Sequence, residues 1–144
     1  MKPIIRDLEE KDLSNGFLDL LNSLSSVHPI DEKTCRKRFN QMKTNYYHRI
    51  FVAEKNSKLI GTSAILVEPK FFHGGKNVAH LEDLVVENNQ QGLGVGSELF
   101  TTLLETAKNY GCYKAIFNCP NSALSFYERI GARPFENSMR VNIL

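Results

Sequence analysis

One stretch of the 144-residue chain, residues 81–118, limits its fold more than any other. Residues 81–86 form an apolar run typical of a strand, and a polar loop rich in glycine follows up to residue 96. An amphipathic helix then runs to Gly111, and residues 113–118 form a second strand that stops before Pro120. Strands joined through a helix are parallel and cross over in the right-handed sense, so this unit predicts a sheet with helices packed on it.

The other segments predict a mixed α/β domain built around this unit. Strands are expected at residues 4–6, 50–54 and 59–67, the last two joined as a hairpin by a turn at residues 56–58. Asp12 and Asp31 are expected to cap two helices, and Asn121 or Ser122 a last helix over residues 123–130. Residues 133–144 could hold a final strand. With no internal repeat or low-complexity linker, residues 1–144 are expected to form one domain.

Composition excludes several classes of protein. A hydrophobic fraction of 42% with a net charge of +2 rules out a disordered chain and implies no nucleic-acid partner by itself. No stretch approaches the roughly 20 apolar residues that a membrane span needs, and the first residues lack a signal-peptide core. The odd number of cysteines, without a Cys-x-x-Cys pair, indicates reduced thiols and a cytoplasmic location. The cysteines are Cys35, Cys112 and Cys119.

The glycine-rich loop predicts a site for a pyrophosphate. It opens a helix, where several backbone N–H groups lack helical partners and the helix dipole is positive. Glycines let a phosphate approach the backbone closely. The residues expected to hold the cofactor here are Gln91, Gly92, Leu93, Gly94, Val95, Gly96 and Ser97.

Three kinds of phosphate loop compete for this interpretation. A P-loop needs a lysine after its last glycine, and Gly96 is followed by Ser97. A dinucleotide fold needs G-x-G-x-x-G and an acidic residue near the tip of the next strand, where this chain has Asn118. The coenzyme A loop of acetyltransferases, with glutamine or arginine, two residues, glycine, one residue and a small residue, fits Gln91-x-x-Gly94-x-Gly96. A plain glycine-rich connector is the remaining alternative.

Four segments of the chain, one of them the glycine loop, together resemble a single family. They are His80-Leu81-Glu82-Asp83-Leu84-Val85-Val86, the glycine loop, Tyr110-Gly111-Cys112-Tyr113-Lys114 and Phe126-Tyr127-Glu128. In this order and spacing they resemble the glucosamine-6-phosphate N-acetyltransferases of the GNAT superfamily, most densely over residues 70–139. The resemblance implies the GNAT acyl-CoA N-acyltransferase fold, with a mixed central sheet flanked by helices.

The resemblance also implies an activity. The donor would be acetyl-CoA, and the acceptor would be the 2-amine of glucosamine 6-phosphate. The product, N-acetylglucosamine 6-phosphate, would serve UDP-N-acetylglucosamine synthesis. A homodimer with an active site completed across its interface is implied as well.

Roles for individual residues follow from the same resemblance. The glycine loop would hold the CoA pyrophosphate, and the backbone of Leu84, Val85 and Val86 would lie along the acetyl group and stabilise the oxyanion. Tyr127 would lie beside the thioester sulfur and supply a proton to the departing thiolate. Glu82 and Asp83 would lie near the sugar, although neighbours on a regular strand point to opposite faces. The residues expected to bind the acceptor further are Ser25, Lys70, His73, Tyr113 and Lys114.

Two positions depart from the family pattern. Asn118 stands where relatives usually carry an acid, and an amide cannot act as a base. Its backbone carbonyl, Glu82 or Asp83, or solvent would then take the proton of the amine. Near the C-terminus, Asn142 stands where the family often has an arginine that reaches the partner's substrate phosphate, with Arg140 nearby.

Some alternatives remain open at this stage. The acceptor could be another amine, such as an amino acid, a polyamine or a protein N-terminus, or the chain could bind acyl-CoA without catalysis. The histidines and cysteines show no metal-ligand spacing, so no metal is expected. The basic run is interpreted as a solvated helix face, with packing roles expected for Cys112 and Cys119. That run consists of Lys33, Arg36, Lys37 and Arg38.

Overall fold

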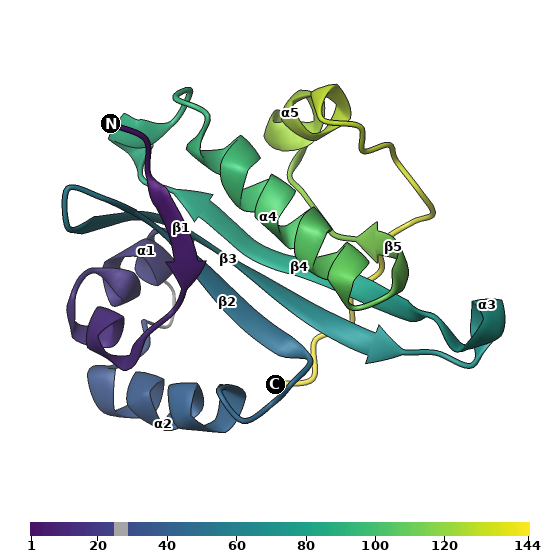
Figure 1. The fold of residues 1–144 in the computed structure, drawn as a ribbon, viewed down its shortest axis with the longest axis horizontal. Helices are drawn as coiled ribbons and strands as arrows, with labels where there is room; N and C mark the ends of the chain where they lie inside the picture. Colours follow the sequence, from purple (N-terminus) through teal and green to yellow (C-terminus); the bar gives the residue numbers. More distant parts are fainter. Residues whose placement is uncertain (25–28) are drawn as a thin grey trace.

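The computed structural model describes residues 1–24 and 29–144. Its centre is a five-stranded sheet in the order β1-β2-β3-β4-β5 (Figure 1). Neighbouring strands are antiparallel except β4 and β5, which are parallel, as predicted for the two strands of residues 81–118. The strands are β1 (Ile4–Asp7), β2 (His48–Lys55), β3 (Lys58–Pro69), β4 (Asn77–Val86) and β5 (Cys112–Ile116).

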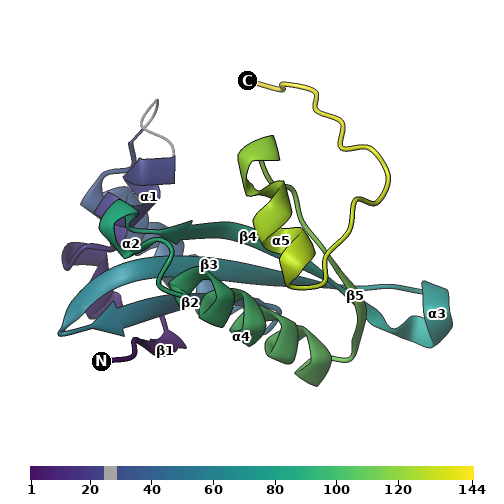
Figure 2. The same cartoon turned by 90° about the horizontal axis from the view of Figure 1, so that it is seen from above.

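Helices cover both faces of this sheet. Helices α1 and α2 lie on one side and α4 on the other (Figure 2). On the α4 side, Leu99 and Leu103 pack with Ile65 of β3, and on the α1 side Phe17 packs with Val52 of β2. The helices are α1 (Phe17–Leu24), α2 (Glu32–Met42), α3 (Phe72–Gly75), α4 (Val95–Asn109) and α5 (Leu124–Arg129), with short 3-10 helices η1 (Glu10–Ser14), η2 (Asn88–Gln90) and η3 (Asn121–Ala123).

The turn between β2 and β3 confirms the predicted hairpin. Asn56 and Ser57 have φ of 51° and 60°, so both central residues are left-handed. A two-residue turn of this kind matches the twist of the flanking strands. Asp31 also caps α2 as expected, because its side chain accepts a hydrogen bond from the backbone N–H of Thr34.

Asp12 does not cap a continuous helix, contrary to expectation. Glu9 is the capping residue of η1, and the Asp12 carboxylate accepts from the backbone N–H of Glu9 at 2.8 Å and from two Arg6 nitrogens at 2.8 and 2.9 Å. Gly16, with a φ of 97°, then separates η1 from α1. Because Asp12 is buried, the bidentate partner Arg6 is what makes its charge tolerable. The two residues are six apart but lie on different elements, so helix periodicity and capping rules do not predict their contact.

The C-terminal part also differs from expectation. Strand β5 ends at Ile116 instead of residue 118. Neither Asn121 nor Ser122 caps the last helix, because both lie inside η3, which opens after Pro120. Residues 132–144 form no strand in the described chain, and the C-terminal segment follows α5 as an extended tail (Figure 2). Apolar side chains alternate along that tail, and Met139, Val141 and Ile143 are all exposed.

Candidate active site

A bulge in β4 shapes the centre of the site. Thr62 of β3 pairs with Val85, and Ala64 pairs with Glu82, so β4 has one residue more than β3 across this step. Asp83 takes up the extra length with a left-handed φ of 54°. The alternation that predicted opposite faces for Glu82 and Asp83 therefore does not hold here, and both residues line one cavity.

The parallel strands β4 and β5 separate at this level. Their pairing runs from Asn77 with Cys112 to His80 with Ile116 and goes no further, while β4 continues to Val86. The edge of β4 that faces β5 therefore has no strand partner over residues 81–86 within the described chain. Backbone groups on such an edge are available to a ligand. This is where Leu84, Val85 and Val86 were expected to contact an acyl group.

A cavity of about 250 Å³ opens where the strands separate. Tyr127 of α5 borders it together with Glu82 and Asp83 of β4, and Asn118 lies on the segment after β5. The predicted catalytic residues are thus brought together. Leu84, which was expected to lie along the acetyl group, also borders it. Its other lining residues are Leu24, Leu81, Phe100, Leu103, Phe117, Cys119 and Pro120.

Tyr127 is held by three aromatic rings. Its ring centroid lies 4.7 Å from that of Phe117, 4.9 Å from that of Phe126 and 5.4 Å from that of Phe100. Burial raises the pKa of Tyr127 above its ordinary value, and the nearby Cys119 adds to the effect. The phenol therefore keeps its proton well above neutral pH, as a proton donor to a leaving thiolate must.

The glycine loop has the geometry of an anion site. Gly94 precedes α4 with a φ of 85°, and no side chain caps the helix. A Cβ at Gly92 or Gly94 would meet no atom within 4 Å, so there is open space beside both residues. Free N–H groups at the start of a 15-residue helix and this open space suit the pyrophosphate of coenzyme A.

Two loop residues have structural roles that the motif did not indicate. The Gln91 side chain donates to the carbonyl oxygen of Val86 at 3.2 Å and to Asn88 Oδ1 at 3.3 Å, which ties the loop to the end of β4. A Cβ on Gly96 would lie 3.3 Å from Phe126 Cζ, so the glycine lets α5 pack against α4. Leu93 is exposed, and Ser97 lies in the first turn of α4.

The residues expected to bind a phosphate gather at the other end of β4. His73 of α3 stacks on Tyr113 of β5 with ring centroids 4.0 Å apart. Lys114 Nζ lies 5.4 Å from the Tyr113 ring and 5.2 Å from the ring of Phe135 in the tail. Lys70 Nζ lies 3.0 Å from Glu68 Oε1. Ser25, also expected near the substrate, is outside the described residues.

A second cavity, of about 200 Å³, joins the two ends of the site. Glu82 and Asn118 border it as they border the first cavity, and Lys114 and His80 border it as well. Tail residues 135–138 close it on the remaining side. A carboxylate and an amide thus lie at one part of the cavity, and the Lys114 ammonium and the His80 imidazole lie at another. The sequence did not indicate His80, although alternation along β4 places it on the same face as Glu82.

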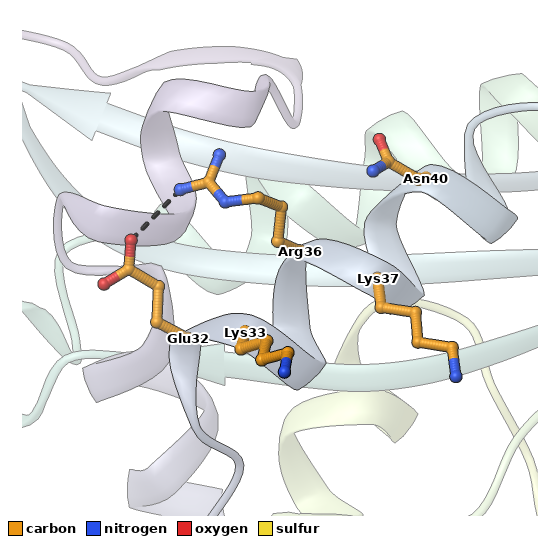
Figure 3. Close-up of a pocket in the computed structure, with 5 residues that line it drawn as sticks. All are labelled: Glu32, Lys33, Arg36, Lys37 and Asn40. Carbon is orange, nitrogen blue, oxygen red and sulfur yellow. Dashed lines mark hydrogen bonds and ion pairs between the residues drawn. The ribbon is translucent and has the colours of Figure 1, made fainter.

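The basic residues of α2 form a separate surface. A depression of about 500 Å³ is lined by Glu32, Lys33, Arg36, Lys37 and Asn40, all from one helix (Figure 3). Arg36 bonds to Glu32 at 3.0 Å and to Glu10 at 2.8 Å, and Lys33 and Lys37 project away from it. These groups do not converge on a common point, as the interpretation of a solvated helix face predicts.

Two further features concern the described residues as a whole. Over residues 1–24 and 29–144, no group of three or more histidine, cysteine, aspartate or glutamate side chains is placed to hold a metal ion. In the same part of the chain, no helix combines the length and the apolar character that crossing a membrane requires.

Burial raises the pKa of the Cys112 thiol, which fits a packing role.

Comparison with known proteins defines the class. The chain matches the acetyltransferase (GNAT) family over residues 15–132, and it belongs to that family. It is an acyltransferase whose donor is acetyl-CoA. The fold that the resemblance implied is thereby confirmed.

Individual members of that family are similar to this chain over most of its length. The chain is 32% identical over 140 residues to glucosamine 6-phosphate N-acetyltransferase of Trypanosoma brucei brucei, covering 96% of this chain and 95% of that protein. It is 40% identical over 130 residues to glucosamine 6-phosphate N-acetyltransferase 1 of Oryza sativa subsp. japonica, covering 88% and 79%. The crystal structure of glucosamine-6-phosphate N-acetyltransferase from Arabidopsis thaliana superposes on this chain with a TM-score of 0.93 at 28% identity, over 99% of each chain.

Proposed function

We propose that this protein acetylates the 2-amine of glucosamine 6-phosphate with acetyl-CoA, in a ternary complex and without an acyl-enzyme. The observation that carries the proposal is the pair of adjoining cavities that share Glu82 and Asn118. One extends to Tyr127 and the other to Lys114. A thioester beside Tyr127 and a sugar phosphate beside Lys114 would place the amine between them. The names of the relatives support the same acceptor.

The proposed chemistry is direct attack on the thioester carbonyl. The glycine loop holds the pyrophosphate, and backbone N–H groups on the free edge of β4 stabilise the oxyanion. Tyr127 protonates the thiolate as it leaves. Much of the rate comes from holding the two substrates side by side.

The amine must lose a proton to react, and Asn118 cannot accept it. Glu82 and Asp83 both border the cavity in which the amine would lie, so a carboxylate is at hand. The backbone carbonyl of Asn118 can orient the amine while solvent carries the proton away. In either case the side chain of Asn118 does not act as a base.

We further propose that the whole chain is one domain, working as a cytoplasmic homodimer with a shared active site. The extended tail supports the dimer, because Met139, Val141 and Ile143 expose between 81% and 89% of their surface at alternate positions. Such a segment gains stability by adding a strand to a sheet of a second copy. Cys35, Cys112 and Cys119 are free, as thiols in the cytoplasm are.

Product analysis tests the proposal. Acetyl-CoA labelled with ¹³C at the carbonyl is incubated with the enzyme and glucosamine 6-phosphate, and the product is examined by ¹³C NMR. We expect the label in an amide at the C2 nitrogen. Label appearing only with an amino acid, a polyamine or a peptide N-terminus would assign another acceptor. Binding of acetyl-CoA without transfer to any of these amines would indicate a non-catalytic module.

A further inference from the structure

Two side-chain nitrogens converge on one carboxylate oxygen at the sheet. Lys70 Nζ and His80 Nε2 each lie 3.0 Å from the same atom, Glu68 Oε1. Lys70 follows the end of β3, and His80 lies in the middle of β4, so the donors come from different parts of the fold. Hydrogen bonds from His80 and then Lys70 lower the pKa of Glu68 below its ordinary value. The structure therefore contains a defined position for an anionic oxygen.

This anion position adjoins the cavity of the proposed acceptor. His80 and Glu82 are two residues apart before the bulge in β4, so they share a face and lie about 6.6 Å apart along the strand. Both line the cavity of about 200 Å³ that also contains Lys114. Lys114 pairs with Val78, and Val78 pairs with Glu68, so Lys114 and Glu68 flank one residue of β4.

The separation suits the acceptor in length. If the amine lies near Glu82, the arm at C6 of the same hexosamine extends along β4 by about two residues, which brings its phosphate to His80. Phosphate oxygens and carboxylate oxygens accept the same hydrogen bonds from ammonium groups and imidazole N–H groups. A sugar phosphate at this place would therefore compete with Glu68 for Lys70 and His80.

We propose that His80 is a phosphate-binding residue of the acceptor site, and that the Glu68 carboxylate holds the anion position until the sugar phosphate displaces it. This inference rests on the proposed function. An unphosphorylated sugar carries no group that competes with Glu68 for these two donors. Glu68 thus weakens the binding of the phosphorylated sugar, because its carboxylate has to leave both donors first.

Removing the charge of Glu68 tests the competition. In Glu68→Gln, we expect the KM for glucosamine 6-phosphate to fall roughly threefold. The change is small because an exposed ion pair of this kind stabilises the competing contact only weakly. The kcat and the KM for unphosphorylated glucosamine should stay unchanged. Glu105→Gln, an exposed residue of α4, is the control for the change in net charge. An unchanged KM, or a raised KM because Glu68 only orients its partners, would overturn the inference.

A second measurement separates this inference from the proposed function. Glucose 6-phosphate carries the phosphate but no amine, so its Kd by titration calorimetry reports on the anion position without any acetyl transfer. We expect Glu68→Gln to tighten its binding, and the gain to vanish when His80→Phe is added. Equal tightening with and without His80→Phe would exclude His80 as the phosphate ligand. Tightening in an enzyme that fails to acetylate glucosamine 6-phosphate would overturn only the proposed function.

Discussion

Tyr127 is the residue on which the proposed chemistry depends most. It borders the cavity that Glu82 and Asp83 also line, and three aromatic rings fix its position. Replacing it by phenylalanine keeps the ring packing and removes only the hydroxyl. We expect Tyr127→Phe to lower kcat by about 100-fold, within the usual range of a general acid, with little change in the Kd for acetyl-CoA. Steady-state kinetics and calorimetry measure both, and an unchanged kcat would exclude the role.

The pH dependence of kcat gives an independent check on the same hydroxyl. Burial raises the pKa of Tyr127, so the phenol is protonated at all pH values below its ordinary range and loses its proton only above that range. We expect kcat to stay level from pH 8 to about pH 10 and to fall only at higher pH. Tyr127→Phe should lack this alkaline decrease. A decrease that survives the substitution would belong to another group.

At the scale of the elements, α5 reaches the site because of one glycine in α4. A Cβ at Gly96 would lie 3.3 Å from Phe126 Cζ, and Phe126 precedes Tyr127. We expect Gly96→Ala to move α5 outward, to lower kcat, and to reduce the free energy of unfolding by about 1–3 kcal/mol, as overpacking does. Enzyme kinetics and urea denaturation measure these effects.

Gly111 offers the matched control for that substitution. It ends α4 with a φ of 70°, and a Cβ there would meet no atom within 4 Å. Gly111→Ala should cost about 1–2 kcal/mol of backbone strain and leave kcat unchanged. Equal losses of kcat in both variants would show that general destabilisation, and not the position of α5, lowers the rate.

Local pattern predicted most of these elements but not their ends. The hairpin turn at Asn56 and Ser57, the cap at Asp31 and the crossover between β4 and β5 follow from neighbouring residues, and all were found. Asp12 was misplaced because its partner Arg6 lies on β1, and local propensity does not contain that contact. The bulge at Asp83 was missed because alternation assumes a regular strand.

The site shows the same division. The motif indicated the glycine loop, and the resemblance indicated Tyr127 and the acidic pair, because each of these lies in a short contiguous segment of the family pattern. His80 and Glu68 were not found, because their meeting depends on the register between β3 and β4. Roles carried over from a resemblance remain proposals for Lys70, His73, Tyr113 and Lys114, although the stack of His73 on Tyr113 brings two of them together.

At the scale of the whole molecule, the C-terminal tail packs little against the rest of the chain, and its apolar side chains Met139, Val141 and Ile143 are exposed. Residues 132–144 form no strand, and yet residues 135–138 close the cavity that contains His80 and Lys114. If the tail joins the sheet of a second copy, its removal should affect assembly and activity together. We expect deletion of residues 139–144, which spares the cavity segment, to convert the dimer to a monomer and to raise the KM for glucosamine 6-phosphate. Light scattering after gel filtration measures the assembly, and a monomeric full-length enzyme with full activity would contradict the shared site.

The central claim is that this enzyme recognises the amine and the phosphate of one sugar at the same time. The most direct measurement is the release of CoA thiol from acetyl-CoA, with glucosamine 6-phosphate and unphosphorylated glucosamine compared side by side. We expect kcat/KM for the phosphorylated sugar to exceed that for glucosamine by about 100-fold or more, as the loss of charge-assisted hydrogen bonds to several cationic groups implies. Equal kcat/KM for the two sugars, or no release with either, would contradict the claim.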